Sequence, residues 1–170
     1  MSCRGMHFSL RNEDVERLMA AKNDREVLDF VQKDIEARWD EENLVASDKA
    51  WDAIHRCLTD GTLKCKNNDT KEKMILGGKQ LYKGNDYIIS FKDTDEVREV
   101  FKAIKGIEKD WFSSKFYNLK KKFFWFSWSQ YDGPLDENDF EYTWSYFLEL
   151  RGFFKKVSEH NQTVIFIVDQ

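Results

Sequence analysis

The C-terminal end of the chain constrains the fold more than any other stretch. Asp136 is placed to cap a helix that runs to about Glu159, and the run TVIFIVD follows at 163–169. The apolar residues of this helix recur at steps of three or four and form one stripe: Phe140, Trp144, Phe147, Leu150, Phe154 and Val157. TVIFIVD is continuously apolar and β-branched, which is typical of a strand buried on both faces. The pattern therefore predicts a long packing helix followed by a buried terminal strand.

Shorter strands and helices are predicted along the rest of the chain. Strands are predicted at 3–10, 73–82, 87–91 and 123–128. Helices are predicted from 13, from 24 to 39, from a cap at Ser47 or Asp48 to Asp60, from 94 to 105 and around 111–119. The pair Gly77-Gly78 indicates a bulge or turn. Strands scattered among helices indicate an α+β fold, a single domain over 1–170 with about four to five short strands packed against five to six helices.

Composition places the chain among globular proteins. Hydrophobic residues make up 41% of the 170 and charged residues 34%, which is too apolar for a disordered chain and too charged for a membrane one. No apolar run approaches the roughly 18 residues that span a bilayer, and charges interrupt the N-terminus where a signal peptide needs an apolar stretch. We therefore expect a cytoplasmic protein without a membrane role.

Charge and cysteine content argue against other classes of partner and cofactor. The net charge of −4 lacks the basic excess of a nucleic-acid-binding protein. Cys3, Cys57 and Cys65 have no CxxC spacing, so we expect free thiols rather than a disulfide framework or a zinc site. The acidic residues at 93–96 and 136–139 fall at helix starts, where carboxylates cap the helix. No cofactor, no metal and no nucleic-acid partner is predicted.

Asp52 and His55 form the strongest candidate for chemistry. They stand at i and i+3 on the helix predicted in KAWDAIHRCLTDGT, where a carboxylate can orient an imidazole and raise its pKa. A structural role is the alternative, in which Trp51, Ile54 and Leu58 bury the helix and His55 lies at the border of this buried face. Because no nucleophile or second acid accompanies the pair, we favour the structural role.

Aromatic residues supply the candidate binding surface. The stretch 115–131 interleaves lysines with aromatic side chains, a composition also found where proteins stack nucleic-acid bases. Because the rest of the chain is acidic, a buried strand or a surface for a protein partner fits this stretch better. Six tryptophans exceed what a core of this size usually requires. We therefore expect Trp51, Trp125, Trp128 and Tyr131 to contribute to a pocket or an exposed patch.

Several motifs resemble the YfbM-like family of bacterial proteins of unknown function. They are KAWDAIHRCLTDGT, the glycine pair in MILGG, the long helix after Tyr131 and the terminal NQTVIFIVD. In that family a helix of the pattern Lys-x-Trp-Asp-x-hydrophobic-His ends in Leu-Thr-Gly. The residues that match are Lys49, Trp51, Asp52, Ile54, His55, Leu58 and Thr59, with Gly61 one place late. The resemblance implies an intracellular bacterial α+β domain and supplies no reaction.

Three hypotheses for the function follow. The leading one is a non-enzymatic protein-interaction module of the toxin-neutralising (immunity) or adaptor type, because the acidic charge suits a basic partner and no catalytic set is complete. The second is a small hydrolase in which Asp52 orients His55 as the base, with Trp51, Trp125 and Tyr131 forming the floor of the pocket. The third is a small-ligand-binding protein that uses the same aromatic pocket.

Overall fold

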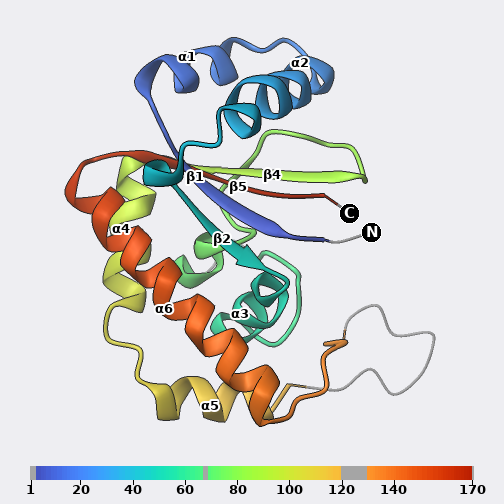
Figure 1. The fold of residues 1–170 in the computed structure, drawn as a ribbon, viewed down its shortest axis with the longest axis vertical. Coiled ribbons are helices and arrows are strands. Elements are labelled where there is room, and N and C mark those ends of the chain that lie inside the picture. Colours follow the sequence, from blue (N-terminus) through green and yellow to red (C-terminus); the bar gives the residue numbers. More distant parts are fainter. Residues whose placement is uncertain (1–2, 67–68, 120–129, 170) are drawn as a thin grey trace.

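A five-stranded antiparallel sheet organises the fold. The structure is a computed structural model that describes residues 3–66, 69–119 and 130–169. Its strands are β1 (Gly5–Leu10), β2 (Leu44–Asp48), β3 (Lys79–Gln80), β4 (Tyr87–Lys92) and β5 (Thr163–Asp169). They lie in the order β2-β1-β5-β4-β3, and each neighbouring pair is antiparallel. The first and last strands of the chain therefore lie side by side within the sheet (Figure 1).

β5 is the central strand, and its side chains are buried on both faces of the sheet. Val164, Phe166 and Val168 belong to one hydrophobic cluster, whereas Ile165 and Ile167 belong to the other. Alternate residues of a strand point to opposite faces, so this strand supplies both cores. The predicted long helix and buried terminal strand are confirmed.

Helices cover the two faces of the sheet in separate groups. One face carries α1 (Asn12–Ala20), α2 (Asp24–Phe30) and the π-helical continuation of α2 (Val31–Glu36). The other face carries α3 (Ala50–Leu58), α4 (Thr94–Ile104), α5 (Lys109–Tyr117) and α6 (Glu137–Glu159). Figure 1 shows the first group above the sheet and the second below it. The α+β fold class is confirmed. Among the described residues, no helix has the length and apolarity needed to span a bilayer.

Side-chain caps fix the starts of α4 and α6. The Asp93 carboxylate accepts a hydrogen bond from the backbone N–H of Glu96 at 2.8 Å, and the backbone N–H of Asp93 donates to the Glu96 carboxylate. The Asp136 carboxylate accepts from the backbone N–H of Asp139 at 2.9 Å. These bonds satisfy first-turn amides that have no partner inside the helix. Both predicted helix starts are confirmed, and Asp93 and Asp136 serve as caps.

The predicted start of α3 is wrong. Ser47 and Asp48 end β2, a strand that the sequence patterns do not predict, and Lys49 is the residue that precedes the helix. β2 spans only LVASD and pairs with the N-terminal strand β1, which lies far away in the chain. A pairing of this kind leaves little local signal, because cross-strand contacts rather than propensity stabilise such a strand.

The strand predicted at 73–82 is also wrong over its first half. A 3-10 helix, η3 (Thr70–Met74), and a turn occupy this part, and β3 begins at Lys79. Gly78 explains the turn, because its φ is +98° and a Cβ there would lie 2.4 Å from the carbonyl oxygen of Phe91. The turn predicted at the glycine pair is confirmed. The strand predicted at 123–128 lies outside the described residues.

Candidate functional site

α3 places the two predicted catalytic residues in different environments. Every residue of α3 except Asp52 is buried. Asp52 faces a cavity at the surface, whereas His55 is enclosed in the interior. The helix therefore separates the two groups that the i, i+3 spacing pairs in the sequence.

The cavity beside Asp52 has a volume of about 560 Å³ and lies between the start of α3, residues 131–134 and the first turns of α6. Three aromatic residues, three carboxylates and one lysine line it: Trp51, Tyr131, Tyr142, Asp52, Asp132, Asp139 and Lys49. Trp51 and Tyr131, two of the predicted binding residues, thus meet in one cavity although they lie far apart in the chain. The other two, Trp125 and Trp128, lie outside the described residues.

Hydrogen bonds hold Asp52 and Asp139 in place. Arg56 donates from Nε to Oδ1 of Asp52 at 2.5 Å. Asp139 accepts from the Tyr131 hydroxyl at 2.8 Å and from the backbone N–H of Leu135 at 3.0 Å. Burial raises the pKa of Asp52, and the Arg56 guanidinium partly offsets this rise. Burial and Asp139 also raise the pKa of Tyr131, so its hydroxyl stays protonated and remains a donor.

The aromatic side chains form a fixed floor and a more exposed rim. The indole Nε1 of Trp51 donates to the carbonyl oxygen of Cys3 at 3.0 Å, and the side chain is only 6% exposed. Tyr142 is 36% exposed, and its hydroxyl donates to Asp48 at 2.9 Å. Both polar tips are therefore bonded within the protein, which fixes the orientation of these two rings.

His55 does not meet Asp52. Its side chain is fully buried, and neither ring nitrogen has a hydrogen-bond partner among the described residues. Burial, together with the positive charges of Lys92 and Arg56, lowers the pKa of His55 to about 4. The ring is therefore neutral near pH 7, and Asp52 bonds to Arg56 instead. This arrangement does not provide an oriented general base at the cavity.

Lys92 is a buried titratable residue that the sequence analysis does not single out. Its side chain is fully buried, and burial lowers its pKa to about 7. The Nζ atom donates to the carbonyl oxygen of Ile75 at 2.7 Å and to both oxygens of Ser90. A lysine without a carboxylate partner in the interior is costly unless it is neutral or well hydrogen-bonded.

His7 lies close to the same group. It is fully buried, and its Nε2 donates to the carbonyl oxygen of Met74 at 2.9 Å. Burial and the charge of Lys92 lower the pKa of His7 to about 3. Strand alternation carries the signal that could locate both residues, since His7 and Lys92 occupy the alternate positions to Phe8 and Phe91, which pack under α1 and α2. His7 and Lys92 are buried because the helices α3 to α6 cover the face of the sheet opposite to α1 and α2.

The described residues contain no group of metal ligands, and their cysteines form no disulfide. Cys3, Cys57 and Cys65 are free thiols, and burial raises the pKa of Cys57, which keeps it protonated. Within residues 3–66, 69–119 and 130–169, no three His, Cys, Asp or Glu side chains are grouped so that they could hold a metal ion.

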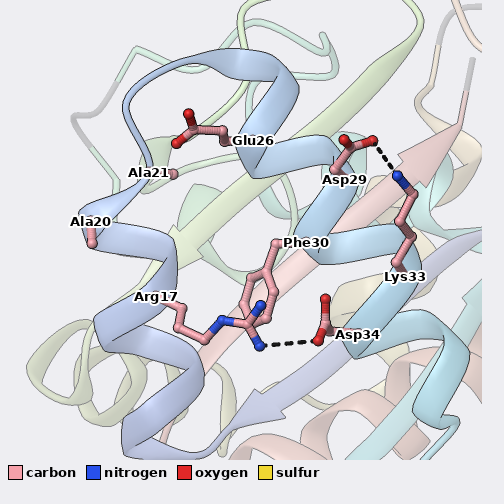
Figure 2. A pocket seen from close by; sticks show the side chains of 8 residues that line it. All are labelled: Arg17, Ala20, Ala21, Glu26, Asp29, Phe30, Lys33 and Asp34. Atoms are coloured by element: carbon pink, nitrogen blue, oxygen red, sulfur yellow. Dashed lines mark hydrogen bonds and ion pairs between the residues drawn. The ribbon is translucent and has the colours of Figure 1, made fainter.

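A second hollow of about 490 Å³ lies between α1 and α2 (Figure 2). Arg17 extends over the ring of Phe30, 4.0 Å from the ring centroid, and lies 3.0 Å from the Asp34 carboxylate. Asp29 and Lys33 form another ion pair at 3.1 Å. Arg17 and Lys33 therefore each have an acidic partner, and Glu26, which also lines the hollow, accepts hydrogen bonds from the backbone N–H of Lys22 and the side chain of Asn23.

Comparison with known proteins finds relatives over almost the whole chain. A family model described as a domain of unknown function (DUF1877) matches residues 1–167. The crystal structure of a protein of unknown function, YfbM from Escherichia coli, is similar over 97% of this chain and 99% of that chain. Its TM-score is 0.70 and its sequence identity is 13%. No curated protein matches. The predicted YfbM-like resemblance is confirmed, and neither match assigns an activity.

Proposed function

Because the chain belongs to the DUF1877 family, a domain family of unknown function, we propose a function from its own residues: it is a non-enzymatic protein-interaction module. In this proposal the cavity beside Asp52 receives an arginine or lysine side chain of a basic partner protein. The cellular form of such an interaction is toxin neutralisation, as by an immunity protein, or an adaptor role in the cytoplasm.

The charge of the cavity lining is the observation that carries the proposal. Three carboxylates, Asp52, Asp132 and Asp139, and one lysine, Lys49, line the cavity. Because Arg56 pairs with Asp52, the charges of these described residues leave an excess of one negative charge. Charges in a concave, partly desolvated site attract an oppositely charged group more strongly than they do on an open surface. The net charge of −4 for the whole chain adds attraction at longer range for a basic partner.

The size and the aromatic content of the cavity also fit a basic side chain. A volume of about 560 Å³ lies within the range of about 300–1,000 Å³ that small-molecule pockets span. Tyr131 and Tyr142 can contact the aliphatic part or the face of a guanidinium, while a carboxylate accepts its N–H groups. An arginine has the better match, because its planar fork can donate two parallel bonds to one carboxylate.

The hydrolase hypothesis receives less support from the same geometry. His55 is buried and has no contact with Asp52, so the predicted base has neither its orienting partner nor access to the cavity. Cys57 is fully buried and protonated. We therefore treat small-molecule binding, rather than hydrolysis, as the alternative that the experiment has to separate from protein binding.

The test is an NMR titration that follows the indole N–H of Trp51, which donates to Cys3 beside the cavity. The probes are N-acetyl-arginine amide, N-acetyl-lysine amide and, as the neutral control, N-acetyl-glutamine amide. We expect saturable shifts at Trp51 and at residues 131–134 with the two cationic probes, and no saturable shift with the glutamine derivative. Equal shifts with all three probes would contradict the proposal.

Matched variants connect the signal to the carboxylates. Asp132→Asn removes one charge of the lining and should weaken arginine binding several-fold, whereas Asp110→Asn, an exposed carboxylate on α5 outside the cavity, should leave it unchanged. A short peptide with one arginine between small residues then separates the two kinds of ligand. Tighter binding of the peptide than of the capped amino acid supports a protein partner, and equal affinity supports a small ligand.

A further inference from the structure

The segment from Thr70 to Gln80 is fastened to the sheet by buried side chains. The carbonyl groups at the end of η3 have no partner within this short helix, as at any helix end. His7 on β1 donates to the carbonyl oxygen of Met74 at 2.9 Å. Lys92 on β4 donates to that of Ile75 at 2.7 Å. The only ladder that joins the segment to the sheet within the described residues is the two-residue strand β3.

Lys92 has little negative charge around it. It faces His7 from β1, His55 from α3, the Cys65 thiol from the loop after α3 and Glu96 from α4. Burial raises the pKa of Cys65, so its thiol supplies no negative charge near neutral pH. On β5, the ring of Phe166 lies 5.6 Å from Nζ.

Glu96, the carboxylate whose charge raises the pKa of Lys92, is already engaged. Glu96 lies 2.9 Å from Lys73 and accepts from the backbone N–H of Asp93. His55 faces Arg56 and Asp60 in addition to Lys92, and Asp60 pairs with Lys66 at the surface. Burial therefore opposes a proton on Lys92, and burial together with the charge of Lys92 opposes a proton on His7.

We propose that Lys92 and His7 form a proton-responsive cluster that controls whether the segment Thr70–Gln80 is attached to the sheet. When these two side chains are neutral, their hydrogen bonds hold the segment in its closed position. When they bind protons, opening of the segment admits water to the charged groups, while the β1, β4 and β5 ladders stay intact. The cluster thus acts as a pH-sensitive latch.

The direction of the response follows from the pKa difference between the closed and open states. In the closed state burial lowers the pKa of Lys92 to about 7, whereas a hydrated lysine has its ordinary value of 10.5. Opening therefore takes up a proton between these values, and each unit of falling pH from about 9 to about 7 favours opening by up to about tenfold. His7, with its pKa lowered to about 3, extends the response below its ordinary value of 6.5.

Amide hydrogen exchange measured by mass spectrometry at pH 8.5 and 7.0, and corrected for the intrinsic exchange rate at each pH, tests this latch. We expect the opening equilibrium of peptides within 70–80 to increase by more than tenfold at the lower pH, and that of peptides from β1 and β5 to change much less. Equal changes in all peptides would mean global unfolding and would overturn the proposal.

Two variants of the lysine and one control complete the test. Lys92→Met removes the titrating group, and Lys92→Gln keeps donors for the carbonyl groups but cannot bind a proton in this range. Either variant, if folded, should abolish the pH dependence of the segment. Lys102→Met, which removes an exposed lysine on α4, should retain it. Persistence of the full pH dependence in a Lys92 variant would overturn the assignment.

Discussion

On one side of α3 a neighbouring charge opposes the effect of burial on a pKa, and on the other side neighbouring charges add to it. On the cavity side, burial raises the pKa of Asp52, but Arg56 provides a counter-ion that keeps an ionised carboxylate in place. On the interior side, burial lowers the pKa of His55, and the positive charges of Lys92 and Arg56 lower it further. Burial pushes each group toward its neutral form, and the sign of the facing charge decides whether that push is opposed.

The comparison teaches that spacing along one helix does not determine which groups act together. Asp52 has His55 at i+3 and Arg56 at i+4, and either spacing allows contact. In the structure Asp52 bonds to Arg56, because a guanidinium compensates the charge of a half-buried carboxylate, whereas a neutral imidazole does not. The environment of the facing elements thus decides between two contacts that the sequence allows equally.

Removing the counter-ion of Asp52 should have the largest effect on the stability of the protein. Arg56→Met leaves Asp52 without its partner and removes the bond to the carbonyl oxygen of Gly61 at 3.1 Å. We expect the free energy of unfolding to fall by about 3 kcal/mol, the low end of the range for breaking a buried pair. Urea denaturation at pH 7 measures the loss.

Two further variants sharpen this result. Arg98→Met removes an exposed arginine paired with Asp95 and should cost less than about 1 kcal/mol. Asp52→Asn introduced into Arg56→Met removes the unpaired charge and should recover part of the loss. If Arg56→Met costs no more than Arg98→Met, the buried pair does not stabilise the cavity side of α3.

The buried His55 on the interior side of α3 should make the stability of the folded state sensitive to acid. Because the folded-state pKa of His55 is about 4 and its ordinary value is 6.5, the folded state binds fewer protons than the unfolded state between these values. Stability therefore falls as pH decreases through this window, by up to about 2 kcal/mol from His55 alone between pH 6.5 and 5. His55→Leu should remove this share of the slope.

The control for this measurement is His160, which is exposed at the end of α6. His160→Leu should retain the wild-type loss of stability on acidification. His7 is also buried with a lowered pKa, so a residual slope of similar size is expected in His55→Leu. A variant His55→Leu with the full wild-type slope would show that the ring is not buried in the neutral form.

The local sequence pattern was sufficient to predict those helices and strands whose defining residues lie within one segment. The stripe of α6 and the apolar run of β5 predict a buried face and a buried strand, and both are observed. The caps at Asp93 and Asp136 act within three residues, so they too are readable from the sequence. β2 depends on pairing with the distant β1, and its five residues show no apolar alternation.

The candidate site was predictable only in part for the same reason. Aromatic content indicates Trp51 and Tyr131, and the structure brings both to one cavity. Asp139 and Lys92 acquire their roles through contacts with other elements: Asp139 with Tyr131, and Lys92 with the carbonyl group of Ile75. Neither contact follows from composition or from spacing, because each joins residues whose proximity the tertiary fold creates.

A smaller effect is expected from the bond between Tyr131 and Asp139. Tyr131→Phe removes the hydroxyl that donates at 2.8 Å but keeps the ring, which lies 6.0 Å from the ring of Phe116. The loss should be about 1 kcal/mol in urea denaturation, the usual net value of one hydrogen bond. Tyr117→Phe is the matched control, because its hydroxyl bonds to Glu137 at 2.8 Å on the exposed surface. A larger loss from Tyr117→Phe would contradict a buried, ordering role for the Tyr131 bond.

The smallest effect on stability is expected at the rim, from Tyr142→Phe. Tyr142 is exposed and its hydroxyl donates to Asp48, which also lies 3.2 Å from Arg4, so the carboxylate keeps a partner after the change. We expect the free energy of unfolding to change by less than about 0.5 kcal/mol. The ring that remains can still contact a bound cation, so arginine binding in the NMR titration should persist. Loss of binding without loss of stability would assign the hydroxyl or Asp48, rather than the aromatic face, to recognition.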